Sequence, residues 1–281
     1  TGQELRTFFA GEPVRLPPVA WKDKPYATSD AGFLYCLSAS NGEILWSLRG
    51  GPSDRKALGN QRLISAWPAR GGPVIRDGTL YFAASIWPFM GTFIYALDAE
   101  TGHITWVNDG NGAQFLKQPH SAPAFAGVAP QGALVATKDL LLIPGGRSVP
   151  AAFDRKTGAL RYFNLADGGK GNGGSFVAAG DKYFYVHTRE REVRTYDLAT
   201  GAQAKSTCNE PVITHDRLYA AATNDAGTAV IRELGTSENV YWEIAADGSG
   251  DLIKAGDFLY AAGKRSITAI RLPKANAQPT I

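Results

Sequence analysis

The sequence predicts an all-β protein, a β-propeller of about six four-stranded antiparallel blades in a single domain spanning residues 1–281. Three observations predict this fold. One turn motif recurs along the chain, and a second hairpin motif lies upstream of each copy. The composition agrees with both, because 32 Gly, 16 Pro and 11% aromatic residues are typical of many short strands joined by tight turns.

The first motif reads LDAETGHITW at residues 97–106. It recurs as LSASNGEILW at 37–46, as FDRKTGALRY at 153–162 and, without the closing aromatic residue, as YDLATG at 196–201. The Asp can accept backbone N–H groups of the turn, and the Gly supplies the positive φ that closes it. The motif therefore predicts a β-hairpin whose second strand ends in a large side chain that packs between sheets.

The second motif is an apolar strand, a short polar turn and an aromatic-rich strand, as at residues 73–82 and 176–185. The aspartates of its turns are Asp77, Asp139, Asp181, Asp216 and Asp257. Two hairpins per repeat give four strands, and a period near ~40 residues with four strands is the signature of a propeller. A two-sheet sandwich would not explain why the same two hairpins recur in the same order.

Six repeat units follow from this pattern. They cover residues 14–48, 72–107, 132–163, 174–205, 210–244 and 250–272. The sixth supplies only three strands, so we expect residues 5–9 to add its outer strand and close the ring. The rival prediction is a partial ring of seven or eight blades. Cys36 and Cys208 fall nearly opposite each other in a six-bladed ring, so we expect no disulfide between them.

The sequence ALDAETGHITW at residues 96–106 resembles the tryptophan-docking motif of PQQ-like repeat proteins. The likeness continues in weaker form from Tyr26 to Leu272. It implies a quinoprotein-type propeller, in a superfamily that includes quinoprotein alcohol dehydrogenases and an outer-membrane assembly lipoprotein. Residues 62–173 also resemble PQQ-like proteins of environmental bacteria, which are often parts of larger multidomain chains. Because the motif residues are architectural, the resemblance implies the fold rather than a chemistry.

The long loops are all expected on one face of the propeller, opposite the tight hairpin turns. They cover residues 50–71, 85–91, 108–131, 144–150, 164–173 and 187–192. Nine basic and five acidic residues give these loops a net charge of +4, against +3 for the whole chain. A face of this kind is expected to attract an anionic ligand.

Several residues of this face are candidates for binding. The ligand-binding candidates are Arg62, Trp67, Arg70, His120 and Arg147. Arg70 directly precedes an inner strand, and His120 is the histidine best placed to act as a general base or ligand. The apolar insertion that holds Trp87, Phe89 and Met90 is the candidate partner surface; the alternative is that it folds over its own blade.

Three functions remain open. The first is a non-catalytic binding or scaffold module for an unknown protein partner or an anionic small ligand. The second is a structural segment of a larger multidomain protein. The third is a PQQ-dependent dehydrogenase, for which the resemblance implies PQQ and calcium held by Glu, Asn and Asp ligands, beside a disulfide between adjacent cysteines. This chain has no adjacent cysteines, so we expect no cofactor and no metal.

Charge and hydropathy exclude two classes of partner. A net charge of +3 falls short of a nucleic-acid-binding protein. No apolar run approaches the ~20 residues that span a bilayer. No signal peptide is visible at Thr1, which resembles a mature or trimmed terminus, and we expect a periplasmic or secreted protein.

Overall fold

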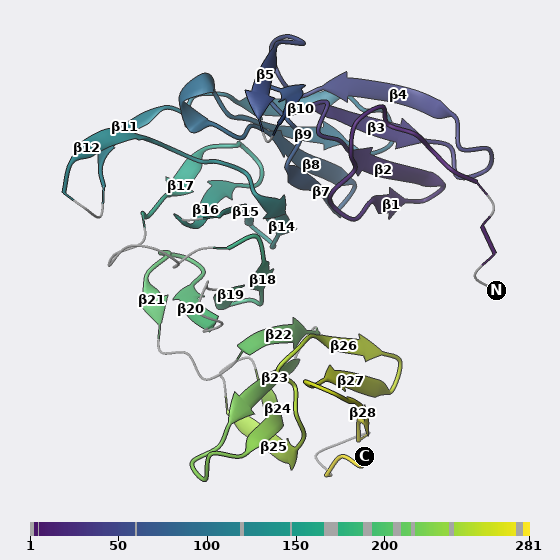
Figure 1. Cartoon of the computed structure of the whole chain (residues 1–281), viewed down its shortest axis with the longest axis vertical. Helices are drawn as coiled ribbons and strands as arrows, with labels where there is room; N and C mark the ends of the chain where they lie inside the picture. Colours follow the sequence, from purple (N-terminus) through teal and green to yellow (C-terminus); the bar gives the residue numbers. More distant parts are fainter. Residues whose placement is uncertain are drawn as a thin grey trace. The chain divides into compact units, whose positions relative to one another are not determined.

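The structure is a computed structural model, and its strands are labelled in Figure 1. It describes residues 3–4, 6–59, 61–118, 121–146, 148–165, 174–187, 193–204, 209–214, 217–235, 239–273 and 278–281. Within these residues the chain has β-strands and one short 3₁₀ turn, η1 (Pro88–Met90), but no α-helix. None of the described residues form a helix long and apolar enough to cross a membrane.

Residues 1–177 and 178–281 form two compact units. The first unit contains three blades, each an antiparallel sheet of four strands in chain order. Blade 1 consists of β1 (Val19–Trp21), β2 (Lys24–Thr28), β3 (Phe33–Leu37) and β4 (Ile44–Arg49). Blade 2 consists of β7 (Gly71–Arg76), β8 (Thr79–Ala84), β9 (Phe93–Asp98) and β10 (Ile104–Asn108). Blade 3 consists of β14 (Val135–Ala136), β15 (Leu140–Gly145), β16 (Ser148–Asp154) and β17 (Leu160–Tyr162).

The second unit contains two four-stranded sheets and one three-stranded sheet of the same kind. Blade 4 consists of β18 (Val177–Ala179), β19 (Tyr183–His187), β20 (Val193–Asp197) and β21 (Gln203–Ala204). Blade 5 consists of β22 (Asn209–Ile213), β23 (Arg217–Thr223), β24 (Ala229–Gly235) and β25 (Val240–Ala245). Blade 6 consists of β26 (Leu252–Ala255), β27 (Phe258–Ala262) and β28 (Ile267–Arg271). These six sheets confirm the predicted repeat units.

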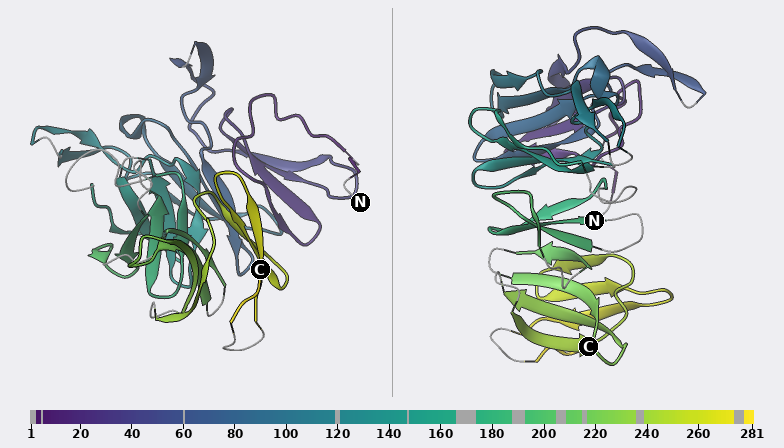
Figure 2. Two further views of the ribbon diagram at one scale, coloured as in Figure 1. Left: turned by 60° about the horizontal axis from the view of Figure 1, so that its bottom comes forward. Right: turned by 90° about the vertical axis from the view of Figure 1, so that its left-hand side faces the viewer.

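Two additional hairpins in the first unit project from its blades (Figures 1 and 2). One is formed by β5 (Lys56–Gly59) and β6 (Arg62–Ser65), between blades 1 and 2. The other is formed by β11 (Gln114–Lys117) and β12 (Pro123–Ala126), between blades 2 and 3. A last short strand, β13 (Gly132–Ala133), pairs in parallel with β7 and joins the inner edge of blade 2.

The turn motif forms as its residues predict. In blade 2, Asp98 Oδ1 accepts the backbone N–H of Thr101 at 2.7 Å and the Thr101 hydroxyl at 2.8 Å. Asp154 and Asp197 make the same contacts in blades 3 and 4. These hydrogen bonds favour the ionised carboxylate, so the pKa of each of the three aspartates is lowered. For Asp154, which also accepts a hydrogen bond from Arg161, the pKa falls to about 2.

A β-bulge orients the closing aromatic residue of the motif. In blade 2 the register of β9 and β10 shifts between Ile104 and Trp106, so that Trp106 lies opposite Ala96. The same shift occurs before Trp46 in blade 1 and before Tyr162 in blade 3. Because neighbouring residues of a strand face opposite sides, one extra residue sets the face on which the aromatic ring lies.

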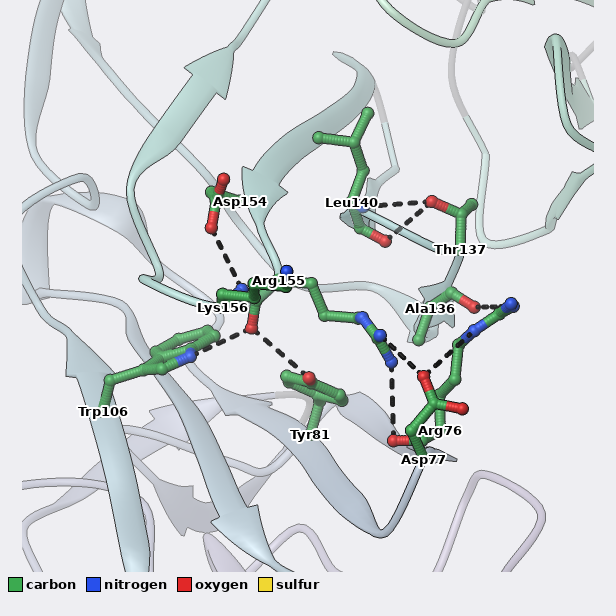
Figure 3. A network of polar contacts seen from close by, with 10 residues as sticks. All are labelled: Arg76, Asp77, Tyr81, Trp106, Ala136, Thr137, Leu140, Asp154, Arg155 and Lys156. Carbon is green, nitrogen blue, oxygen red and sulfur yellow. Dashed lines mark hydrogen bonds and ion pairs between the residues drawn. The ribbon is translucent and has the colours of Figure 1, made fainter.

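The aromatic residue of one blade then packs on the glycine turn of the next blade. A Cβ placed on Gly102 would lie 2.7 Å from the Trp46 ring, and one placed on Gly158 would lie 2.5 Å from Trp106. The indole N–H of Trp106 donates to the carbonyl of Arg155 at 3.1 Å, and the Tyr81 hydroxyl donates to the same carbonyl at 3.3 Å (Figure 3). Turn and ring therefore join neighbouring blades of the first unit.

Charged side chains reinforce this junction between blades 2 and 3. Arg155 Nη2 contacts Asp77 Oδ2 at 2.7 Å, and Arg76 donates to the carbonyl of Ala136 at 3.2 Å (Figure 3). Asp77 belongs to the tight β7–β8 turn and Arg155 to the β16–β17 turn. The face with the short turns is thus occupied by contacts that hold the blades together.

Blade 5 has an aromatic residue at the equivalent position without the turn motif. The register of β24 and β25 shifts just before Trp242, which lies opposite Glu233 and donates its indole N–H to that carboxylate at 2.5 Å. Its ring lies 6.2 Å from Tyr219, as Trp106 lies 6.0 Å from Tyr81. The aromatic contact therefore persists in blade 5 although its sequence lacks the Asp-x-x-Thr-Gly turn.

The hydrophobic cores lie between neighbouring sheets. Tyr26 and Leu34 of blade 1 pack with Leu80 and Phe82 of blade 2. Cys36 belongs to this core as a buried free thiol, and burial raises its pKa. The other cysteine, Cys208, lies outside the described residues.

The N-terminal segment contacts blade 1. Arg6 donates to the carbonyl of Ala39 at 3.0 Å, and the Phe8 ring lies 5.2 Å from Tyr35. Residues 6–9 have no strand conformation in this structure. In blade 6, Thr280 forms an isolated antiparallel bridge with Arg271 of β28. The pairing of residues 5–9 with blade 6 joins the two units and stays a prediction.

Replacing Gly102 with Ala tests the docking of Trp46. Gly102 has a φ of +74°, so alanine strains the backbone, and its Cβ also collides with the indole ring. We expect the free energy of unfolding to fall by about 2 to 4 kcal/mol, as measured by urea denaturation. Gly227→Ala is the matched control, because Gly227 has a φ of +76° but nothing within 4 Å of its Cβ. Its loss is expected to be about 1 kcal/mol; equal losses in both variants would contradict a specific role for the docking contact.

Replacing Asp154 with Asn tests the charge of the turn. The ordinary Asp pKa is 3.8 and the folded value is about 2, so the ionised carboxylate stabilises the protein above about pH 4. That contribution is lost as the pH falls through 2. We expect Asp154→Asn to be less stable than the wild type at pH 7 and the difference to shrink toward pH 2, as followed by urea unfolding. A difference independent of pH would exclude the charge as its cause.

Candidate functional site

The site is built on the long-loop face of the first unit. In a blade of four antiparallel strands, the loop between the second and third strands lies at the same end as the connection to the next blade. We call this end of the first unit the long-loop face; among the described residues it includes 29–32, 50–59, 61–70, 85–92, 109–118 and 121–134.

The β2–β3 loop is buried at the base of this face. Ser29, Asp30 and their neighbour Thr28 are almost fully buried. The Asp30 N–H donates to the carbonyl of Pro13 at 2.9 Å, and the Ser29 carbonyl accepts the N–H of Ala69 at 3.1 Å. The loop is thereby fixed between the N-terminal segment and the segment that leads into β7.

Three arginines surround the carboxylate of Asp30. Arg15 Nε lies 2.5 Å from Oδ2, and Arg70 Nε lies 3.3 Å from Oδ1. Arg62 Nη2 lies 3.8 Å from Oδ2, which is an ion pair but too long for a hydrogen bond. These arginines come from the N-terminal segment, from β6 and from the residue before β7. We call Asp30 and these three residues the arginine cluster.

The arginine cluster brings together two of the predicted ligand-binding residues, Arg62 and Arg70. Sequence reasoning missed Arg15 and Asp30, because neither lies in a long loop or in a repeated motif. The only signal was Asp30 itself, an ionisable residue in the loop after β2, which needs a partner if it is buried.

Trp67 lies beside the cluster but is buried. It packs with Ala66, Ala84 and Phe93, and its indole N–H donates to the carbonyl of Met90 at 2.9 Å. This contact holds η1 against blade 2. Ligand binding by Trp67 stays a prediction, and in this structure its ring supports the segment that carries Arg70.

Only part of the predicted partner surface is exposed in the structure. Met90 packs on the small core around Trp67, and Trp87 is partly buried. Phe89 remains largely exposed. The insertion therefore does fold over its own blade, and Phe89 is the part of it that a partner could reach.

The two remaining predicted residues, His120 and Arg147, lie outside the described residues. The structure does not test their place in the site.

The projecting hairpins expose apolar side chains that sequence reasoning treated only as parts of long loops. Leu58 of β5 lies opposite Leu63 of β6, and both are largely exposed. Phe115 of β11 lies opposite Phe125 of β12, with 63% and 65% exposure and ring centroids 5.2 Å apart. Each pair lies across a two-stranded sheet, and all four side chains are more than half exposed among the described residues.

The structure does not test whether the chain holds PQQ and calcium, as quinoprotein dehydrogenases do, and the absence of a cofactor stays an expectation. The sequence has no adjacent cysteines, since Cys36 and Cys208 are its only two. The described residues contain no group of three or more His, Cys, Asp or Glu side chains placed to hold a metal ion.

Solved structures show which fold these blades belong to. BamB from Moraxella catarrhalis is 14% identical with a TM-score of 0.55, and the match covers 90% of this chain and 70% of that one. A europium-containing methanol dehydrogenase is 12% identical with a TM-score of 0.52, covering 87% and 64%. The quinohemoprotein alcohol dehydrogenase ADHIIG from Pseudomonas putida HK5 is 11% identical with a TM-score of 0.50, covering 90% and 55%.

These likenesses confirm the predicted all-β propeller of four-stranded blades. At such low identity they show the fold alone, and this chain spans less than two thirds of either dehydrogenase. No curated protein matches the sequence at a significant level.

A family model supplies the assignment. The model described as outer membrane protein assembly factor BamB matches residues 2–164, which is more than half of the chain. That stretch contains the three complete turn motifs and all three blades of the first unit, and it includes the arginine cluster and both projecting hairpins. The chain therefore belongs to this family of PQQ-like β-propeller proteins.

Proposed function

We propose that the chain is a non-catalytic propeller that binds a protein partner through the long-loop face of its first unit. The exposed aromatic pair of the β11–β12 hairpin is the observation that carries this proposal. An isolated two-stranded hairpin is marginally stable in water at best. A hairpin that exposes Phe115 and Phe125 on one side gains stability when a partner covers those rings.

The β5–β6 hairpin supports the same surface. Leu58 and Leu63 form a second exposed apolar pair, and Phe89 adds a third apolar position on the long-loop face. Interfaces are typically organised around a few buried aromatic or apolar anchors inside a polar rim. The charged residues Lys56 and Lys117, on the same hairpins, would belong to such a rim.

The family description supports this role and a location. It names an assembly factor for outer membrane proteins. We propose that this chain likewise acts on the periplasmic side of that membrane, as a scaffold that holds a partner rather than as an enzyme. A segment of a larger multidomain protein would use the same surface.

Site-specific crosslinking tests the proposed surface. A photoreactive phenylalanine analogue is placed at position 115 or 58 of the full chain, expressed in its native cells. Position 156 is the control, because Lys156 is exposed in a tight turn at the other end of the strands. We expect a discrete protein adduct from positions 115 and 58 but not from 156. The adduct from position 115 should weaken at least about tenfold when Phe125 is replaced by Ser, since an interface hot spot contributes about 2 kcal/mol or more and about 1.4 kcal/mol is tenfold.

Equal adducts from all three positions, or none, would contradict the proposal. The melting temperature of the Phe125→Ser variant is measured in parallel. It should stay near the wild-type value, because Phe125 lies outside the blades and their cores.

Reconstitution tests the dehydrogenase alternative. The purified chain is incubated with PQQ and Ca²⁺, and dye reduction is followed with primary alcohols as substrates. We expect no quinone absorbance to remain with the protein after gel filtration and no dye reduction. Retained quinone together with alcohol-dependent dye reduction would overturn the non-catalytic proposal.

A further inference from the structure

The arginine cluster holds more positive charge than Asp30 can neutralise. Three guanidinium groups share one carboxylate, which leaves an excess of two positive charges. Around Glu100, by contrast, Lys22 and Lys24 are balanced by Glu100 and Asp23. Around Asp77, Arg76 and Arg155 leave an excess of one. Neutralising one buried carboxylate therefore does not account for the composition of the cluster.

Hydrogen-bond donors of the cluster are also in excess. Arg15 and Arg70 each contact Asp30 through Nε alone. Within the described part of the chain, their terminal nitrogens and the whole fork of Arg62 have no hydrogen-bond acceptor in the protein. A guanidinium presents five N–H donors in a fixed planar fork that matches a carboxylate or phosphate. Most of the donors of the cluster therefore have no acceptor among the described residues and can bind an anion.

The exposure of the side chains shows which part of the cluster faces the solvent. The Asp30 side chain is 2% exposed, while those of Arg15, Arg62 and Arg70 are 45%, 40% and 23% exposed. The carboxylate is therefore the buried base of the cluster, and the guanidinium groups meet the solvent. An approaching anion meets positive charge first, and the partial burial of the site strengthens that attraction over the value in bulk water.

Two buried hydroxyl groups lie next to Asp30 in the sequence. Thr28 and Ser29 directly precede Asp30, and their side-chain oxygens are buried without a hydrogen-bond partner among the described residues. Buried polar groups that lack a partner are uncommon in native proteins and often mark an unseen water, ion or ligand. This observation is independent of the charge count and points to the same loop.

We propose that Arg15, Arg62 and Arg70, oriented by Asp30, form a binding site for an oxyanion of charge −2, a phosphate group or a dicarboxylate. The excess of two positive charges matches a ligand of charge −2. The guanidinium N–H groups match the oxygen atoms of an oxyanion. Asp30 holds the three arginines together in the protein without ligand and offsets one of their charges, so it competes with the anion for their guanidinium groups. Arg62 belongs to the β5–β6 hairpin and precedes Leu63, so the site borders the proposed partner surface, but the anion contacts would be made by the guanidinium groups and not by the exposed apolar pairs.

Thermal unfolding of the full chain tests the site. Sodium phosphate or sodium succinate is titrated at about pH 8, where both are mainly dianions, and the ionic strength is held constant with NaCl. A ligand that binds the folded state raises the melting temperature in a saturable way. We expect a saturable rise in melting temperature with at least one dianion and no such rise with NaCl alone. The dianion with the lower apparent Kd shows whether the site prefers a phosphate group or a dicarboxylate. No saturable rise with either dianion would overturn the proposal.

Two variants establish where the anion binds. Arg62→Ala removes the arginine with the longest contact to Asp30, so it should fold normally and weaken dianion binding about tenfold or more. Arg265→Ala is the matched control; it removes the same charge from an exposed arginine of blade 6 and should leave the apparent Kd unchanged. Equal weakening in both variants would show non-specific attraction and overturn the proposal.

A third variant separates ligand binding from a purely structural ion pair. Asp30→Asn keeps the side-chain shape but removes the negative charge beneath the arginines. We expect lower stability without ligand, because the like charges of the arginines then repel one another. Dianion binding should tighten, because the attraction for an anion increases. Weaker or absent dianion binding in a folded Asp30→Asn protein would contradict the assigned roles.

Discussion

Packing of an aromatic ring on the glycine turn of the next blade is the contact on which the architecture of the first unit depends. A four-stranded sheet cannot bury both of its faces alone, so each blade needs a neighbour. Trp46 on Gly102 and Trp106 on Gly158 fix how neighbouring blades meet. The glycines are needed for two reasons, positive φ and the absence of Cβ, and the bulge before each tryptophan turns its ring toward the junction.

In this arrangement the two ends of the strands have different roles. The tight turns at one end are occupied by docking contacts and by the Arg155–Asp77 pair. At the other end the connections need only join one blade to the next, so they can carry additional hairpins, as β5–β6 and β11–β12 do. A rigid scaffold with free loops at one end is the usual basis for a binding surface.

Much of the fold could be predicted because its signals are local. An Asp, a Thr and a Gly within five residues determine a turn, and they repeat. Trp242 was missed because its turn lacks those residues, although its bulge and its tyrosine neighbour are the same. Arg15 and Asp30 were missed for another reason: they are 15 residues apart and meet only when the N-terminal segment lies against the β2–β3 loop. A charge count over long loops finds Arg62 and Arg70 but cannot find the carboxylate that joins them.

The same reasoning explains why family membership says little about ligands. The residues that make the chain recognisable, such as Asp98, Gly102 and Trp106, lie in the tight hairpins and their docking contacts. They are constrained by the packing between blades, which does not involve a ligand. Asp30 and its arginines lie at the opposite end of the strands, where sequence can vary without disturbing the contacts between blades. At 14% identity to BamB, the shared part is the scaffold. What distinguishes this chain must therefore be sought in the charge and the exposed apolar pairs of its long-loop face.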